Sequence, residues 1–161
     1  MIDAFAWIEQ TRLSVFVRED LYAYFVLLIL HAWGMALLIG GGIAISLRVM
    51  GVAAGTRIER FAQFLPWMKA GAVIAVVSGI GLLFGYPAKA LTNWIFALKF
   101  ACLIAAALLV RHMVRKWFAG AEPLSPCARW TGAAALALWI AGVACGKLLL
   151  YTNTVLLASD G

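Results

Sequence analysis

Few ionisable residues lie inside the strongly apolar stretches of the chain. His31, Lys99 and Lys147 each lie within a long run of apolar residues. An ionisable group inside a bilayer is costly, so each such residue is expected to have a function or a specific partner. A neutral imidazole is a good iron ligand, and a deprotonated lysine amine can be one. These residue types therefore predict a site for a metal or a metal-containing cofactor.

The glycines that follow His31 narrow this prediction. Gly34 and Gly41 lie three and ten residues after the histidine, on the same face of a helix. Bare backbone beside an imidazole admits a flat macrocycle, and helix bundles build such cofactor sites from inward side chains on facing helices. The alternative is that His31 bonds to a carbonyl or hydroxyl group of the next helix, while the glycines serve packing alone.

Depth along the helices indicates which of these groups can meet. His31 lies about 15 Å beyond Leu21 at the helical rise, and Lys99 lies roughly 10 Å beyond Thr92 on a parallel span. His112 lies about 30 Å beyond Thr92. We therefore expect His31 and Lys99 at one level. His112 is expected to be a structural residue near the cytoplasmic side or a ligand to a second group.

Two further cations are expected near the outer side. Lys147 lies four residues before Tyr151, and Arg18 precedes the first apolar run. Both are weaker candidates for contacts to the propionate groups of a haem. The chain has no Cys-x-x-Cys-His sequence, which excludes covalent attachment of the c type.

The elements that must position these residues are membrane spans. The chain has 161 residues, of which 65% are hydrophobic and 12% are charged. A soluble domain of this length could not bury so much apolar surface. Helices are the only open structures that satisfy their backbone in lipid. We predict an all-α, four-helix membrane bundle as one domain, 1–161, with the lipid bilayer as partner and spans at about 21–47, 65–86, 94–117 and 130–151.

The first twenty residues differ from the spans. They mix Phe5, Trp7 and Ile8 with acidic and basic residues, which is typical of an amphipathic segment lying at the membrane interface. Ser14 is the candidate helix cap in this segment. The segment lacks the basic n-region and apolar core of a cleavable signal peptide, so we expect it to remain in the mature protein.

Basic residues predict the orientation. They gather in the first and third connections, and aromatic–basic interleaving typical of nucleic-acid binding is absent from the sequence. The positive-inside rule puts these connections in the cytoplasm of a bacterial inner membrane, with both termini periplasmic. The residues that carry this argument are Arg48, Arg57, Arg60, Lys69, Arg111, Arg115, Lys116 and Arg129.

Two segments carry a family resemblance. The segments are "HAWGMALLIGGGIAISLR" and "NWIFALKFACLIAAALLVRHMVRKW". They resemble small bacterial four-helix membrane proteins that include HemJ-type protoporphyrinogen oxidases, the CopD membrane domain and, most similar, uncharacterised relatives. In the HemJ type a first-span histidine and a third-span lysine form the functional pair, linked to b-type haem. The resemblance implies that role for His31 and Lys99.

Three functions follow as expectations. The first is a haem b-binding membrane protein that transfers electrons or performs a membrane redox step, with a membrane or periplasmic redox partner. The second is a cofactor-free accessory subunit of a larger complex, favoured by rows of small residues. The third is a proton or copper transporter. The sequence argues against this function, because every Asp and Glu lies outside the four apolar runs and no carboxylate is left for a cation path. The sequence leaves open whether the protein is an oxidoreductase and whether it forms a homo-oligomer.

Overall fold

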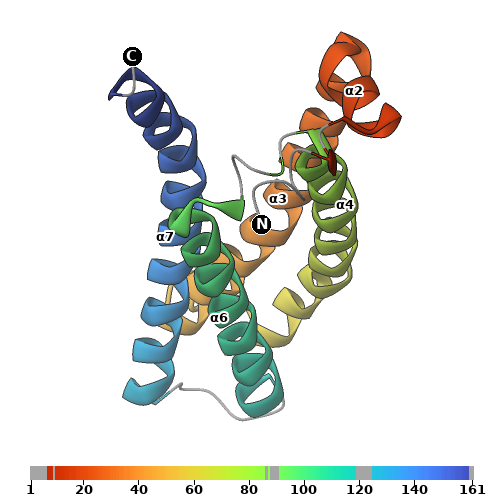
Figure 1. Ribbon diagram of the computed structural model, residues 1–161. Helices are drawn as coiled ribbons and strands as arrows, with labels where there is room; N and C mark the ends of the chain where they lie inside the picture. Colours follow the sequence, from red (N-terminus) through yellow and green to blue (C-terminus); the bar gives the residue numbers. More distant parts are fainter. Residues whose placement is uncertain (1–6, 9, 86, 88–90, 119–124, 160–161) are drawn as a thin grey trace.

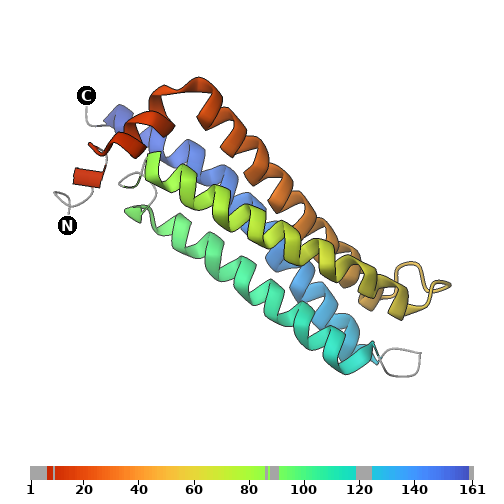
Figure 2. The ribbon, with the colours of Figure 1, turned by 90° about the vertical axis from the view of Figure 1, so that its right-hand side faces the viewer.

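Four long helices make up most of the molecule. The computed structural model describes residues 7–8, 10–85, 87, 91–118 and 125–159. Each long helix has a segment that is long and apolar enough to cross a membrane, and they lie along one another as a bundle (Figures 1 and 2). The predicted all-α architecture of four spanning helices is confirmed. The helices are α3 (Leu21–Met50), α4 (Phe64–Gly85), α6 (Trp94–Trp117) and α7 (Pro126–Ser159).

Capping residues set where the helices begin and end. The Asp20 carboxylate accepts a hydrogen bond from the Ala23 amide at 2.8 Å, which starts α3. Gly51, with φ 107°, ends the same helix in the left-handed conformation that glycine adopts at no steric cost. The Asn93 side chain accepts from the amide of Ile95 at 3.0 Å and starts α6.

The helix before the first span is short. It is α2, Arg12–Glu19, and it lies at the end of the bundle where α3 begins (Figure 1). The Thr11 hydroxyl accepts a hydrogen bond from the Ser14 amide at 3.3 Å. The expectation that Ser14 is the cap is therefore wrong: the cap is Thr11, three residues earlier, and Ser14 is buried inside the helix. The earlier part of the segment, 1–6, lies outside the described residues.

The long helices do not contact one another equally. Helix α3 packs along α4 and α7, and α6 packs along α7, whereas α3 and α6 touch only briefly. Among the described residues, α4 and α6 are scarcely in contact. Helices α4 and α6 are therefore less closely packed than the other neighbouring long helices.

The interior is also uneven along the helix axes. The basic end is the end where α3 and α6 finish and α4 and α7 begin. Most of the buried core lies in the half next to it, with Ile45, Val49 and Met113 fully buried. At the opposite end, here called the α2 end, α3 exposes Leu21 and Tyr22. Figure 1 shows α7 and α2 lying well apart at that end.

Candidate cofactor site at His31

His31 lies on α3 in the half of the bundle toward the α2 end, and its ring faces α4. The side chain is half-buried. Its Nδ1 lies 2.9 Å from the carbonyl oxygen of Ala75 and 3.3 Å from the hydroxyl oxygen of Ser78. The hydrogen bond that the packing alternative expected is therefore present.

The partners of His31 decide where its proton lies. The Ala75 carbonyl can only accept, and the Ser78 hydroxyl donates its hydrogen to the carbonyl of Ile74 at 2.6 Å. Nδ1 must therefore carry the hydrogen and donate it to the Ala75 carbonyl, with the Ser78 oxygen as a longer neighbour at 3.3 Å. In a neutral imidazole this leaves the lone pair on Nε2. Among the described residues, no group forms a hydrogen bond with Nε2.

Gly79 completes the surface under the imidazole. A Cβ built at this position would lie 3.1 Å from Cε1 and 3.3 Å from Nδ1 of His31. These contacts are tighter than those of most real Cβ atoms, so glycine lets the ring sit close to α4. Our sequence reasoning missed Ser78 and Gly79 as site residues. The signals that could have indicated them are a hydroxyl in an apolar span and a glycine one residue later.

The two glycines beside His31 on α3 serve helix packing in this structure. A Cβ at Gly34 would lie 2.8 Å from the Gly71 carbonyl oxygen, and one at Gly41 would lie 3.0 Å from the Met68 sulfur. The helix face that we expected to be open for a macrocycle is therefore covered by α4. A group bound by Nε2 must approach His31 from another side.

Lys99 lies on α6 and is also half-buried. Its Nζ would be 3.8 Å from a Cβ built at Gly146, so the end of the lysine side chain lies beside α7 at a position without a side chain. His31 and Lys99 lie on α3 and α6, two helices that touch only briefly. None of the described residues accepts a hydrogen bond from this amine.

The other predicted site residues lie elsewhere. Lys147 is exposed on α7, and Arg18 is half-buried on α2. His112 is exposed toward the basic end, where its ring packs edge to face against Trp117 with 5.6 Å between centroids. Among the described residues, no hydrogen bond or ion pair joins any of these three side chains to His31. The described residues also contain no cluster of three or more histidine, cysteine or acidic side chains.

The fold and the site together define a class: a multi-pass helical membrane protein with a half-buried, hydrogen-bonded histidine between two of its spans. Comparisons of the chain with protein-family models, with curated proteins and with solved structures found no match. The function is therefore argued from the geometry of His31 and its surroundings.

Proposed function

We propose that the protein binds haem b in a bacterial inner membrane and transfers electrons or performs a membrane redox step. His31 is an axial ligand through Nε2, and Lys99 is the second ligand or a polar partner of the haem. Both termini face the periplasm, and a membrane or periplasmic redox partner exchanges the electrons. When bound, the haem supplies one-electron chemistry at its iron.

One observation carries this proposal: the Nδ1 hydrogen bond of His31 to the Ala75 carbonyl at 2.9 Å. Histidines that bind metals almost always donate their other ring N–H to a carbonyl, carboxylate or water. Such a bond fixes the tautomer and the ring orientation and raises the basicity of the ligating nitrogen. His31 therefore has the protonation pattern that iron ligation through Nε2 requires.

The donor set also fits a haem. An imidazole on α3 and an amine on α6 come from helices that touch only briefly. Both side chains are half-buried. Two nitrogen donors from non-adjacent helices match the way helix bundles hold a planar cofactor between facing side chains. Because α3 packs closely against α4 at Gly34 and Gly41, the two helices together hold the backbone of His31 in place.

The resemblance to HemJ-type proteins supports the same pair of residues and favours an oxidoreductase. The accessory-subunit alternative relied on the rows of small residues. In the structure Gly34, Gly71 and Gly142 pack against helices of the same chain. These glycines are thus used inside the bundle and do not themselves call for a larger complex.

The test is the absorption spectrum of the protein purified with haem supplied during expression. We expect Soret and α bands that are lost in His31→Ala. His112→Ala is the matched control, because it removes an imidazole that is exposed near the other end of the bundle; its spectrum should be unchanged. Lys99→Ala is expected to keep the haem but shift the bands, as a changed axial ligand or neighbour does.

Two results would contradict the proposal. One is a wild-type protein without haem bands even after haemin is added. The other is a haem-loaded His31→Ala variant with the wild-type spectrum. Circular dichroism of each variant in detergent separates loss of the ligand from loss of the fold.

A further inference from the structure

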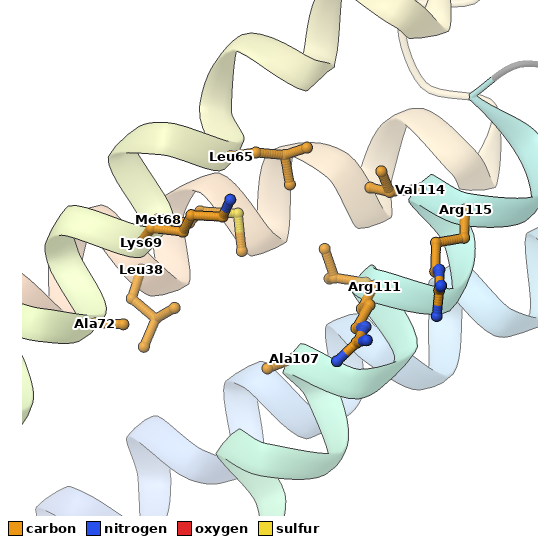
Figure 3. A pocket seen from close by; sticks show the side chains of 10 residues that line it. Leu38, Leu65, Met68, Lys69, Ala72, Ala107, Arg111, Val114 and Arg115 are labelled. Carbon is orange, nitrogen blue, oxygen red and sulfur yellow. The ribbon is translucent and has the colours of Figure 1, made fainter.

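The bundle has a groove between α4 and α6 near the basic end, independent of the histidine site. The groove has a volume of about 530 Å³. This lies within the ~300–1,000 Å³ range typical of small-molecule sites. It exists because α4 and α6 are scarcely in contact among the described residues. Figure 3 shows side chains from both helices, with Leu38 of α3 beside them.

The groove is lined by apolar side chains and by three cationic ones. Leu65, Ala72, Ala107 and Val114 supply apolar surface. The charged lining residues are Lys69 from α4 and Arg111 and Arg115 from α6, one helical turn apart (Figure 3). Among the residues that the structure describes, no acidic side chain lines the groove. In the part of the chain that the structure describes, none of the three cations forms an ion pair.

The depth of the cations matches a lipid headgroup. Lys69 lies five residues inside the start of α4, and Arg115 lies two residues before the end of α6. At the helical rise, all three charges fall within roughly 10 Å of the helix ends. Long basic side chains at this level extend to the interface. Basic pockets between spans are known sites for the headgroups of anionic lipids.

We propose that this groove binds an anionic glycerophospholipid from the adjacent leaflet. The phosphate lies among Lys69, Arg111 and Arg115, and an acyl chain lies along the apolar wall between α4 and α6. Three cations that form no ion pair with any described residue, around an apolar groove, are complementary to an amphiphile with one negative headgroup. A zwitterionic lipid with the same chains lacks the net charge that this arrangement selects.

The experiment compares two lipids on the full-length protein in detergent. Dioleoyl phosphatidylglycerol or dioleoyl phosphatidylcholine is added, and bound lipid is counted by native mass spectrometry. We expect preferential retention of phosphatidylglycerol. Each basic residue near an anionic surface contributes about fivefold in affinity (about 1 kcal/mol). R111Q/R115Q should therefore weaken binding by roughly 25-fold.

A matched pair of variants separates local contact from net charge. R60Q/K116Q removes the same charge from exposed residues at the basic end that do not line the groove. It should retain phosphatidylglycerol nearly as the wild type does. Ala107→Phe fills the groove with all cations kept and should reduce retention severalfold, whereas Ala134→Phe, on an exposed position of α7, should not.

Three outcomes would overturn the proposal. The first is equal retention of the two lipids. The second is an equal effect of R111Q/R115Q and R60Q/K116Q. The third is loss of haem bands in R111Q/R115Q with unchanged lipid retention, which would assign the cations to propionates. A fourth outcome would do the same: if inorganic phosphate displaces the lipid at a concentration equal to that of the lipid, its affinity matches that of the lipid, and the acyl chain contributes nothing.

Discussion

In the half of the bundle next to the basic end, side chains from all four long helices fill the interior. Ile45, Met68, Met113 and Trp139 are buried there or at mid-bundle. In the half toward the α2 end, α3 exposes large apolar residues such as Phe25, and the half-buried His31 rests on α4. We call the first half, which holds most of the buried core, the closed half, although the groove between α4 and α6 lies on its surface. We call the second half, which holds the half-buried His31, the open half.

This difference indicates how a small membrane protein can separate stability from binding. The hydrophobic effect does not hold helices together within lipid, so close packing of side chains must do so. Under the proposed function, concentrating that packing in one half leaves the other half for the cofactor held by His31 and Lys99. A cofactor placed between α3 and α6 at the α2 end would supply contacts that these helices do not make with each other.

The largest effect on the closed half is expected from Trp139→Ala. The indole is fully buried and lies against the backbone of Gly42, where a Cβ would overlap the ring. Removing a buried tryptophan typically costs about 3–5 kcal/mol of unfolding free energy. Unfolding in mixed micelles measures it. Trp33→Ala, at an α3 position that is 68% exposed, should change stability by less than about 0.5 kcal/mol.

If Trp139→Ala and Trp33→Ala destabilise the protein equally, the distinction between a packed and an open half is wrong. The haem spectrum of a Trp139→Ala variant that still folds should match the wild type. A changed spectrum would show that the two halves are coupled.

The next effect concerns the open half. In Gly79→Ala the new Cβ would lie 3.1 Å from His31 Cε1, so the ring must move by a few tenths of an ångström. Changes to the groups that orient a metal-binding histidine typically cost 10–100-fold in affinity. We expect roughly tenfold weaker haem binding in a haemin titration, with shifted bands.

Gly81→Ala is the control for this change. It lies on the same helix, and its new Cβ would meet the flexible end of Leu27 at 3.0 Å instead of the imidazole. Both variants gain the same helix propensity, about 1 kcal/mol over glycine. If Gly79→Ala and Gly81→Ala bind haem with equal affinity, Gly79 is not part of the haem site.

How far the sequence could predict this molecule differs between fold and site. The spans followed from hydropathy and length, and α6 ends at Trp117 as predicted. Helix α3 runs past the predicted 47 to Met50 and ends where Gly51 takes the left-handed conformation, with φ 107°. Helix α7 continues to Ser159, beyond the predicted 151.

The site was less accessible because it depends on which helix faces lie together. The helical rise predicts that His31 and Lys99 lie at one level, and this stays a prediction. The sequence could not decide whether Gly34 faces a cofactor or a helix, since bare backbone suits both. Nor could it show that Ala75 would present its carbonyl to His31. Such partners follow from the rotation of α4 about its axis.

The smallest predicted effect tests the cap that begins the open half. Asp20 accepts from the Ala23 amide at 2.8 Å, and its own amide donates to the Phe16 carbonyl at 3.0 Å, so this residue joins α2 to α3. Asp20→Ala removes only the side-chain bond and should cost about 1 kcal/mol. Hydrogen exchange should rise at Ala23 and leave the basic end unchanged. Glu19→Ala removes the same charge from an exposed neighbour and keeps the Asp20 cap. If hydrogen exchange at Ala23 rises as much in Glu19→Ala as in Asp20→Ala, the effect comes from the charge and not from the cap.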